Sequence, residues 1–326
     1  MRAMVCRAYG SIDNLGLADV AAPSPGPGQI AIDVHAAGVN FGEMLMVLGQ
    51  YQEKPPVPFT PGFEVAGTVR ALGEGATGFA AGDRVMAALP WGGYAEVAVA
   101  AANAVFPIPP GMDFDTAAGF PIAYGTAYGA LAWRAQLKPG QTVLVLGAAG
   151  GVGLAAVEVA AAIGATVIAA AGDAEKCTLT LAHGATHAID YRREDLRERV
   201  RTLTADRGVD VVFDPVGGEA FTQALRSIAW GGRILVIGFA SGSVPQIPAN
   251  HVLVKNIDIM GFVWGSYRRR RPDFLTGAFA RLTAWYAEGR LRPVISHRLG
   301  LTEATAAFRL LRERRVIGKI VLQTSA

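Results

Sequence analysis

The stretch "TVLVLGAAGGVGLAAVEVAAAIGATVIAAAG", residues 142–172, decides the fold of this chain. Its only ionisable side chain is Glu158, so a membrane span is the first possibility to test. Glycines cluster at 147–153, and a charge near the middle of a bilayer costs at least about 2.5 kcal/mol, so this possibility fails. The pattern instead predicts an apolar strand at 142–147, a turn, a helix at 153–163 that Gly164 ends, and a second strand at 166–171.

The turn at 148–153, Ala-Ala-Gly-Gly-Val-Gly, predicts a phosphate-binding site. Backbone N–H groups and the positive end of a helix meet a dinucleotide pyrophosphate at this point of a strand–turn–helix unit. A side chain at Gly150 or Gly151 would block that approach, and Gly153 lets the helix pack closely on the strand. The motif resembles AxxGxxG rather than GxGxxG, so a glycine-rich turn without a ligand is the competing interpretation. The five strands that follow favour the nucleotide.

From Gly140 onward, short apolar strands alternate with helices. Four more strands are expected at 186–189, 209–217, 231–238 and 257–263, with helices at 175–183, 195–203 and 220–230. Six strands alternating with helices predict an α/β fold, a doubly wound parallel sheet of the Rossmann type.

The first 121 residues follow a different pattern, in which short strand-like segments alternate with turns rich in Gly and Pro. The segments 23–40, 62–73 and 82–100 predict an antiparallel, barrel-like half. After a helix at 273–288, the tail at 301–323 is typical of a helix followed by a final strand, which is free to rejoin the first half.

The composition limits the classes of function. A length of 326 residues favours two domains, and a net charge of +3 gives no argument for nucleic acid or an anionic membrane as partner. The basic run Arg268–Arg271 is typical of a solvated loop or a helix entrance. Cys6 and Cys177 form no CxxC pair, which excludes a disulfide framework and a structural zinc lobe. The first residues lack the apolar core of a secretory signal, so a cytoplasmic protein is expected.

The end of the second strand distinguishes between the two nicotinamide dinucleotides. An NAD site generally has Asp or Glu there, which binds the ribose 2′-OH. Here the strand ends in three alanines and Gly172, while Lys176 and Tyr191, with two arginines after it, offer donors to a 2′-phosphate. NADPH is therefore the expected cofactor. Asp173 opposes this prediction unless it caps the next helix, and Lys176 alone is equally well an exposed helix residue.

Five segments occur in a family-specific order: "AAGVNFGEMLMVLGQY" (36–51), "PGFEVAGTV" (61–69), "IAYGTAYGAL" (122–131), "GAAGGVG" (147–153) and "GKIVL" (318–322). The chain resembles the zinc-free quinone oxidoreductases, the zeta-crystallin-like group of the medium-chain dehydrogenase/reductase superfamily. The resemblance implies a GroES-like substrate domain at 1–121 and 289–326 and a Rossmann NADP-binding domain at 122–288. The cleft between them would hold nicotinamide and substrate.

The zinc-dependent alcohol dehydrogenases of the same superfamily need an early Cys and a His in a Gly-His-Glu motif. Here the corresponding regions contain Asn40 and Gly62-Phe63-Glu64, so no metal ligands are expected. Without a metal to ionise an alcohol, alcohol oxidation is not expected. Reduction of an electrophilic acceptor, a quinone or an activated alkene, remains feasible when the nicotinamide is held close to it.

The resemblance also assigns site residues. It implies that Asn40 and Tyr51 lie near the nicotinamide as catalytic residues. At the phosphates of the cofactor, it implies contacts from Gly150, Gly151 and Val152 with the pyrophosphate and from Gly172, Lys176 and Tyr191 with the adenosine phosphate. At the nicotinamide ribose and carboxamide, it implies contacts from the backbone of Gly238, Phe239, Ala240, Phe262 and Val263. It also implies cofactor contacts from Thr126 and Lys319. Lys319 is equally an ordinary strand-end lysine. Glu43 departs from the Asp that the group more often carries, so the resemblance assigns it no catalytic role.

The remaining polar candidates are weaker. The five histidines are scattered without ligand spacing and are typical of surface or satisfied histidines. Asp113 and Asp115 suit a helix cap better than an acid–base dyad. Trp91 and Tyr94 either line the substrate mouth or belong to a packed loop.

Three functions follow as hypotheses. The first is an NADPH-dependent quinone reductase, with a proton from water or a cleft hydroxyl such as Tyr51. The second is an NADPH-dependent enone or enoyl-thioester reductase, in which Tyr51 donates the proton. The third is a non-enzymatic NADPH-binding protein, for which Arg268–Arg271 is the only local support. The apolar strand at 257–263 would form a sheet edge, and the resemblance implies a homodimer made through it.

Overall fold

The computed structural model describes residues 1–324, except for the side chains of Arg268 and Arg269. The chain forms two compact units: unit 1 comprises Met1–Ile122, Gly265–Thr283 and Pro293–Ala326, and unit 2 comprises Ala123–Trp264 and Ala284–Arg292. The segment 265–283, which the predicted limits assign to the Rossmann domain, groups with unit 1. There the ring of Phe279 stacks on that of Phe106 with centroids 3.6 Å apart. The domain limits derived from the sequence stay a prediction.

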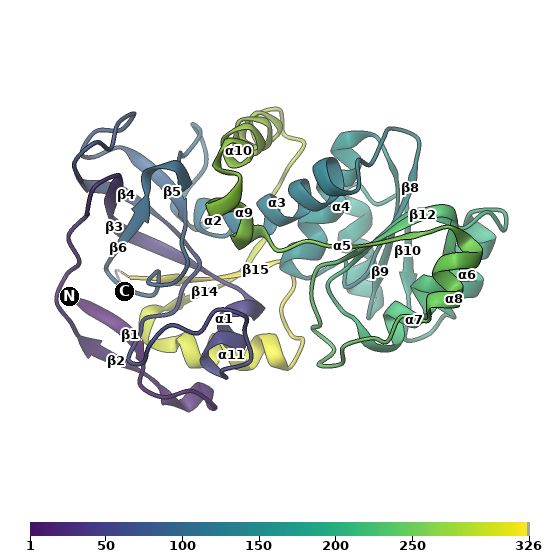
Figure 1. Cartoon of the computed structure of the whole chain (residues 1–326), viewed down its shortest axis with the longest axis horizontal. Helices are drawn as coiled ribbons and strands as arrows, with labels where there is room; N and C mark the ends of the chain where they lie inside the picture. The colour runs from purple at the N-terminus through teal and green to yellow at the C-terminus, as the bar shows by residue number, and fades with distance from the viewer. Residues whose placement is uncertain (325–326) are drawn as a thin grey trace. The chain divides into compact units, whose positions relative to one another are not determined.

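Unit 2 is built on a six-stranded parallel sheet (Figure 1). Its strands are β8 (Thr142–Val145), β9 (Thr166–Ala171), β10 (His187–Asp190), β11 (Val209–Asp214), β12 (Ile228–Val236) and β13 (Asp258–Gly261). They lie in the order β10-β9-β8-β11-β12-β13, and every neighbouring pair is parallel. In chain order this is 3-2-1-4-5-6, which confirms the predicted doubly wound sheet and puts the reversal of strand order between β8 and β11.

Helices precede β8 and connect the later strands. They are α3 (Pro121–Tyr128), a π-helical turn (Gly129–Arg134), α4 (Gly151–Ile163), α5 (Ala174–Ala182), α6 (Leu196–Leu203), α7 (Gly218–Ser227) and α8 (Ala249–Lys255). Helix α4 buries Leu154 and Val157 and ends at Gly164, whose φ of 95° lies in the left-handed region that favours glycine. Asp195 caps α6 by accepting a hydrogen bond from the third N–H of the helix. Helix α8, which the sequence pattern did not predict, buries none of its side chains.

Unit 1 contains a seven-stranded sheet in the order β14-β15-β3-β4-β5-β7, with β6 also paired to β3. The strands are β3 (Gln29–Val39), β4 (Glu64–Leu72), β5 (Arg84–Ala88), β6 (Val97–Ala101), β7 (Val105–Pro107), β14 (Ile295–Gly300) and β15 (Lys319–Gln323), and a separate hairpin joins β1 (Arg2–Cys6) to β2 (Leu15–Asp19). Strand β15 pairs antiparallel with β3, Ile320 opposite Val39, so the final strand does rejoin the first half. This pairing brings residue 319 beside residue 40.

The helices of the remaining chain are α1 (Phe41–Val47), α2 (Phe114–Ala118), α9 (Trp264–Arg270), α10 (Pro272–Ala287) and α11 (Ala304–Arg312). Asp113 caps α2 by accepting from the N–H of Thr116, as the cap interpretation predicts. The basic run lies at the end of α9 rather than in a loop, and Arg271 pairs with Asp273 over 3.0 Å. The side chains of Arg268 and Arg269 lie outside the described residues.

Candidate active site

Five polar side chains of unit 1 meet beside its apolar core. We call them the Glu43–Lys319 cluster: Asn40, Glu43, Glu64, Tyr94 and Lys319. Separate segments supply them, namely the β3–α1 junction, the start of β4, the loop before β6 and the start of β15. Glu43, Glu64 and Tyr94 are 0% exposed and Lys319 is 7% exposed, whereas Asn40 is half-buried. Because buried charges lose their hydration, contacts within the cluster must replace it.

The Glu43 carboxylate accepts four hydrogen bonds. The backbone N–H of Asn40 donates to Oε2 over 2.6 Å, and the backbone N–H of Phe63 donates to Oε1 over 2.7 Å. The Tyr94 hydroxyl donates to Oε2 over 2.5 Å, and Asn40 Nδ2 donates to Oε1 over 3.1 Å. The first of these bonds is a capping contact, since Glu43 is the third residue of α1 and reaches back to the residue that begins the helix. A local helix cap therefore brings a carboxylate into the tertiary site.

The second carboxylate of the cluster forms an ion pair. Lys319 Nζ lies 2.6 Å from Glu64 Oε1, and the backbone N–H of Ile122 donates to Glu64 Oε2 over 2.8 Å. Lys319 also donates to Asn40 Oδ1, and Asn40 Nδ2 donates to Glu64 Oε1 over 2.9 Å. Two carboxylates and one ammonium leave the cluster with one negative charge when all three are ionised. Removal of the ammonium would leave two buried negative charges, a strongly destabilising state.

Two glycines provide the space for this ion pair. A Cβ at Gly38, in β3, would lie 2.4 Å from Glu64 Oε1 and 2.4 Å from the carbonyl oxygen of Ala118. A Cβ at Gly119 would lie 2.9 Å from Lys319 Cγ. Both contacts are shorter than real Cβ atoms make, so a larger residue at either position displaces the ion pair or its backbone.

Burial raises the pKa of the Glu43 carboxyl to about 7, against the opposing effects of the Lys319 charge and of the hydrogen bonds from Tyr94, Asn40 and Phe63. Burial also raises the pKa of the Tyr94 hydroxyl well above its usual value, and Glu43 and Glu64 add to that rise. Tyr94 therefore stays protonated and keeps donating at neutral pH. Near pH 7 the Glu43 proton is gained or lost, which changes the charge of the cluster.

Both predicted catalytic residues lie in unit 1. Asn40 belongs to the cluster, and the ring of Tyr51 packs against that of Phe63 with centroids 5.3 Å apart. The Tyr51 ring also comes close to α1, since a Cβ at Gly42 would lie 3.2 Å from Tyr51 Cε2. That Asn40 and Tyr51 act in catalysis stays a prediction.

Two interpretations of unit 1 change with the structure. Tyr94 does not line a mouth, because it is fully buried and bonded to Glu43, whereas Trp91 of the same loop is 40% exposed. Glu43, which the sequence comparison left aside, lies at the centre of the cluster and makes a short bond of 2.5 Å after all. The spacing Asn40-x-x-Glu43 was the signal that could have found it, because it is a capping-box pattern. Glu64 carried no such local signal.

In unit 2, the positions between β8 and α4 carry glycine for different reasons. Gly147 has a φ of 57°, and a Cβ at Gly153 would lie 2.2 Å from the Gly147 carbonyl oxygen, so the packing of α4 on the turn requires glycine there. Gly150 has a φ of −79°, and a Cβ at this residue would meet nothing closer than the Gly147 carbonyl oxygen at 3.4 Å. The protein itself therefore does not require glycine at 150. A glycine that the protein does not need, at the N-terminus of α4, is what close approach of a pyrophosphate to the backbone requires, so these residues fit a dinucleotide.

The other predicted cofactor residues of unit 2 follow the carboxyl ends of its strands. Gly150, Gly151 and Val152 follow β8, Gly172 and Lys176 follow β9, Tyr191 follows β10, Gly238, Phe239 and Ala240 follow β12, and Phe262 and Val263 follow β13. Ligands of doubly wound sheets bind at this edge. Thr126 lies in α3 and is 7% exposed. Lys319 is the exception, since it belongs to unit 1. The assignment of all these residues to a cofactor stays a prediction.

Donors gather around Gly172 at the end of β9. A Cβ at Gly172 would lie 2.9 Å from the Tyr191 hydroxyl oxygen and 3.5 Å from Arg192 Nε. Lys176 Nζ lies 3.0 Å from Asp173 Oδ2. Asp173 caps α5 through the Lys176 N–H, and that bond, ahead of the nearby positive charges, lowers the pKa of its carboxyl. The cap interpretation of Asp173 is thus confirmed, and the same carboxylate partly neutralises Lys176.

Asp214, at the end of β11, is a buried residue that the sequence analysis missed. Its Oδ1 accepts from the N–H groups of Val216 and Gly217 over 2.7 and 2.9 Å. Its Oδ2 is buried and has no hydrogen-bond partner within the described chain. Burial raises the pKa of this carboxyl, against the effect of the two N–H bonds. Asp214 therefore shapes the loop next to the β8 turn, where the strand order reverses.

Glu158, the one ionisable residue of the opening stretch, is 1% exposed in α4. Its carboxylate accepts from the Tyr124 hydroxyl over 2.6 Å and from the backbone N–H of Arg292 over 3.1 Å, and His183 Nδ1 lies 2.5 Å away. These partners come from α3, the end of α5 and the segment 284–292, all in unit 2. Glu158 thus joins helices inside a protein core, and His183 is a satisfied histidine.

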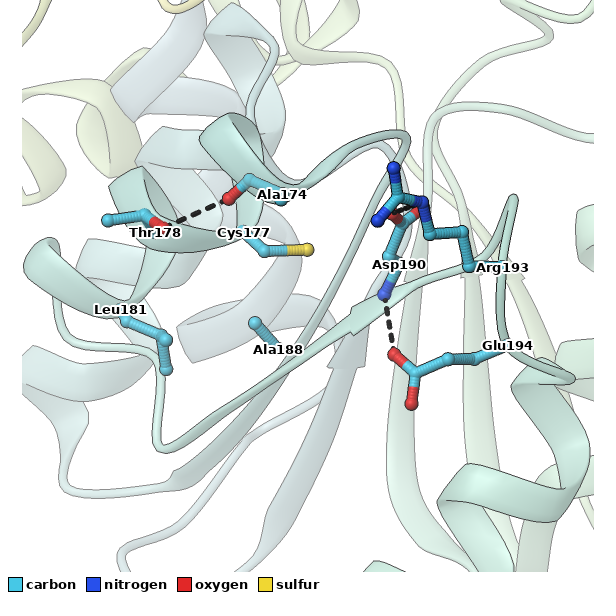
Figure 2. A pocket seen from close by; sticks show the side chains of 8 residues that line it. All are labelled: Ala174, Cys177, Thr178, Leu181, Ala188, Asp190, Arg193 and Glu194. Atoms are coloured by element: carbon cyan, nitrogen blue, oxygen red, sulfur yellow. Dashed lines mark hydrogen bonds and ion pairs between the residues drawn. The ribbon is translucent and has the colours of Figure 1, made fainter.

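A surface pocket of about 360 Å³ lies between α5 and β10 (Figure 2), and its lining residues are Ala174, Cys177, Thr178, Leu181, Ala188, Asp190, Arg193 and Glu194. None of them belongs to the predicted cofactor set. Burial, followed by the negative charges of Asp190, Asp173 and Glu194, raises the pKa of the Cys177 thiol, so the thiolate is disfavoured. The pocket therefore offers no activated nucleophile.

The described residues contain neither a metal cluster nor a membrane-spanning helix. Among residues 1–324, no group of three or more His, Cys, Asp and Glu side chains is arranged to hold a metal ion. In the same part of the chain, no helix combines the length and the apolar character that crossing a membrane requires.

Comparisons with known proteins match both units. An alcohol dehydrogenase GroES-like domain model matches residues 26–110, and a zinc-binding dehydrogenase model matches residues 151–281. The quinone oxidoreductase-like protein 2 homolog of Nematostella vectensis is 41% identical over 92% of this chain and 82% of its own.

Solved structures extend the match to the whole chain. Escherichia coli quinone oxidoreductase complexed with NADPH is 29% identical and has a TM-score of 0.93, with 99% of this chain and 100% of its own covered. The CurK enoyl reductase is 30% identical and has a TM-score of 0.89, with 99% and 98% covered. Together with the parallel sheet and the glycine turn of unit 2, these findings identify a nicotinamide-dinucleotide-binding oxidoreductase fold. The chain belongs to the quinone oxidoreductase family of the medium-chain dehydrogenase/reductase superfamily.

Proposed function

We propose that this protein is a zinc-independent, NADPH-dependent quinone oxidoreductase. The observation that carries the proposal is the full-length similarity to a quinone oxidoreductase whose structure contains NADPH. Gly150 supports the dinucleotide, because a Cβ there would make only an ordinary van der Waals contact at 3.4 Å and no close contact within the protein explains the glycine.

Bound NADPH would supply the hydride for the reaction. Within unit 2, backbone at Gly150, Gly151 and Val152 would hold the pyrophosphate. Lys176 and Tyr191 would bind the 2′-phosphate near Gly172, where β9 ends in alanine rather than in a carboxylate and the nearby Asp173 carboxylate caps α5. The backbone of Gly238, Phe239 and Ala240, with Phe262 and Val263, would hold the nicotinamide ribose and carboxamide.

The donor set of unit 1 suits a reaction without a metal. Asn40 and Phe63 supply neither a thiolate nor an imidazole, and the Glu64 carboxylate is already paired with the Lys319 ammonium. These residues therefore do not ionise an alcohol, and the substrate must be electrophilic by itself. Quinones satisfy this condition.

A substrate panel tests the proposal. Purified protein is assayed for NADPH and NADH oxidation with quinones, enones and enoyl-thioesters. We expect NADPH oxidation with at least one quinone class, and a lower Michaelis constant for NADPH than for NADH. Binding of NADPH without oxidation by any acceptor would overturn the proposal in favour of a non-enzymatic NADPH-binding protein.

An enone or enoyl-thioester reductase is the second candidate, and the similarity to the CurK enoyl reductase favours it. The two functions differ in the need for a proton donor, because alkene reduction places a proton on carbon. In a Tyr51→Phe variant, alkene reduction would be lost while quinone reduction would persist. Loss of both activities would contradict this separation.

We further propose a homodimer in the cytoplasm. Strand β13 is an edge of the unit 2 sheet, and the preceding helix α8 exposes Leu253 and Val254 at 76% and 74%. Exposed strand edges and apolar side chains favour association with a second copy. Light scattering at micromolar concentration should give twice the mass of the chain, and a monomer would contradict the dimer.

A further inference from the structure

The Asn40 side chain uses most of its hydrogen-bonding capacity inside the protein. An Asn amide has two N–H donors and a carbonyl oxygen that accepts two bonds. Asn40 Nδ2 donates to Glu43 Oε1 over 3.1 Å and to Glu64 Oε1 over 2.9 Å, and Asn40 Oδ1 accepts from Lys319. Both donors are therefore occupied, and Oδ1 accepts one of its two possible bonds from the described residues.

The surrounding charges determine which way this amide faces. Carboxylates only accept and an ammonium only donates. A flipped amide would bring its NH₂ group against Lys319 and its oxygen against Glu64, so both of these contacts would become repulsive, and the contact with Glu43 would be repulsive whenever Glu43 is ionised. The orientation of Asn40 is thus fixed by chemistry and not merely by assignment.

Of the two carboxylates, Glu43 makes more hydrogen bonds with Asn40 than Glu64 does. Glu64 divides its oxygens among Lys319, Ile122 and Asn40, whereas Glu43 binds Asn40 twice, through the backbone N–H and through Nδ2. The hydrogen bonds from Tyr94 and from the Phe63 N–H hold the Glu43 carboxylate in place.

We propose that Glu43 is a positioning residue that holds the Asn40 NH₂ group inward, so that Asn40 offers a ligand only its carbonyl oxygen and accepts from the hydroxyl of the reduced product. This inference rests on the proposed function. It adds that, in the hydrogen bond between Asn40 and the substrate, Asn40 is the acceptor. Asn40 in this orientation does not donate to the oxygen of a quinone or an enone.

The reaction has a consequence for kinetics. Reduction of a quinone to a hydroquinone adds one hydride from NADPH, which becomes NADP⁺, and one proton from solvent. The substrate oxygen begins as an acceptor and ends as a hydroxyl donor. The bond to Asn40 Oδ1 therefore forms only as the oxygen gains its proton, and its loss should lower kcat more than it changes KM.

The first test observes Asn40 without substrate or cofactor. The protein is labelled with ¹⁵N-asparagine, and the Asn40 NH₂ resonances are assigned by their loss in Asn40→Ser. We expect slow solvent exchange in the wild type and at least about tenfold faster exchange in Glu43→Gln, whose own NH₂ group meets donors on every side. The exposed residue Glu74 provides the control, since Glu74→Gln should leave the exchange unchanged.

A second variant answers the possibility that Glu43→Gln fails to fold. The groups that face Glu43 are Tyr94, Glu64 and Lys319, with the N–H groups of Asn40 and Phe63. The Tyr94 hydrogen bond lowers the pKa of Glu43, so Tyr94→Phe should move the midpoint of the pH titration seen at the Asn40 NH₂ group to higher pH. A midpoint that does not move, or an Asn40 resonance that does not titrate, would overturn the proposal.

The third test uses the active enzyme. Glu43→Gln should lower kcat at least about tenfold with KM changed less than about threefold, and Glu43→Asp, which keeps the carboxylate, should recover part of kcat. If the wild type reduces no acceptor, the proposed function fails and the exchange experiment still decides the orientation of Asn40. If the enzyme is active but Glu43→Gln changes neither kcat nor exchange, the inference fails and the function stands.

Discussion

The two candidate sites of this protein differ in composition: one consists of charged side chains and the other of backbone. In unit 1, the Glu43–Lys319 cluster consists of buried charges that four distant segments bring together. In unit 2, the β8–α4 turn consists of backbone and glycines that are close neighbours in the sequence. The first site resists change because each charge compensates another. The second depends on the absence of side chains, so the addition of one carbon atom is enough to test it.

The largest expected effect tests the charge compensation of unit 1. Lys319→Met leaves Glu43 and Glu64 buried without a cation, and we expect a loss of about 3 to 5 kcal/mol in the free energy of unfolding. Urea unfolding followed by circular dichroism measures the loss. Lys54, which is exposed in the same unit, supplies the control Lys54→Met. A loss below about 1 kcal/mol would mean that the Lys319 ammonium does not stabilise the buried carboxylates of Glu43 and Glu64.

The pH dependence of stability tests the same cluster through its proton. The pKa of Glu43 is about 7 in the folded protein and close to its usual value of 4.5 when unfolded. The folded state binds the extra proton between these values, so the stabilising effect is complete below pH 4.5 and disappears as the pH rises through 7. The difference amounts to at most about 3 kcal/mol.

Unfolding free energies of the wild type and Glu43→Gln, measured from pH 4.5 to 8, isolate this effect from the other titrating groups. We expect the difference in free energy of unfolding between the wild type and Glu43→Gln to become smaller as the pH rises. A difference that stays constant would show that Glu43 keeps its ordinary pKa.

A pair of alanine substitutions tests the backbone site of unit 2. Gly153→Ala forces a Cβ to within 2.2 Å of the Gly147 carbonyl oxygen, so it should cost about 1 to 3 kcal/mol of stability and weaken NADPH binding as well. Gly150→Ala meets no closer contact than 3.4 Å and should cost at most about 1 kcal/mol.

The informative measurement is NADPH binding to Gly150→Ala, followed by fluorescence. Its dissociation constant should rise at least about tenfold although the protein is stable, because the new methyl group occupies the space for the pyrophosphate. Unchanged affinity would argue against a phosphate at this turn.

The smallest effect concerns the choice of cofactor. Lys176→Glu should raise the Michaelis constant for NADPH about tenfold, equivalent to about 1.4 kcal/mol, and leave that for NADH nearly unchanged, because only NADPH carries the 2′-phosphate. Lys138→Glu, at an exposed lysine of the same unit, is the control. Equal effects on the two cofactors would contradict the role of Lys176.

Much of unit 2 was readable from the sequence because its signals are local. A strand, a glycine turn and a helix are contiguous in residues 142–172, and the alternation of apolar strands with helices predicted six strands in a doubly wound parallel sheet. Helix α8 was missed because it is short, buries no side chain fully, and leaves Leu253 and Val254 exposed, so its apolar residues do not mark one core-facing side. Gly172 likewise indicated the end of β9 correctly, although the cap formed by Asp173 needed the structure.

The chemistry of unit 1 shows what local signals leave open. The sequence determined the strands and glycines of this half and drew attention to Asn40, but it gave Glu64 no distinguishing pattern. It left Glu43 aside, and it described Lys319 equally well as a strand-end residue. Only the pairing of β15 with β3 brings residue 319 beside residue 40 and makes one buried cluster of two carboxylates and an ammonium. The physical reason is that periodicity and turns act between neighbours in the chain, whereas compensation of buried charge acts through space, and the tertiary fold alone determines which charges meet.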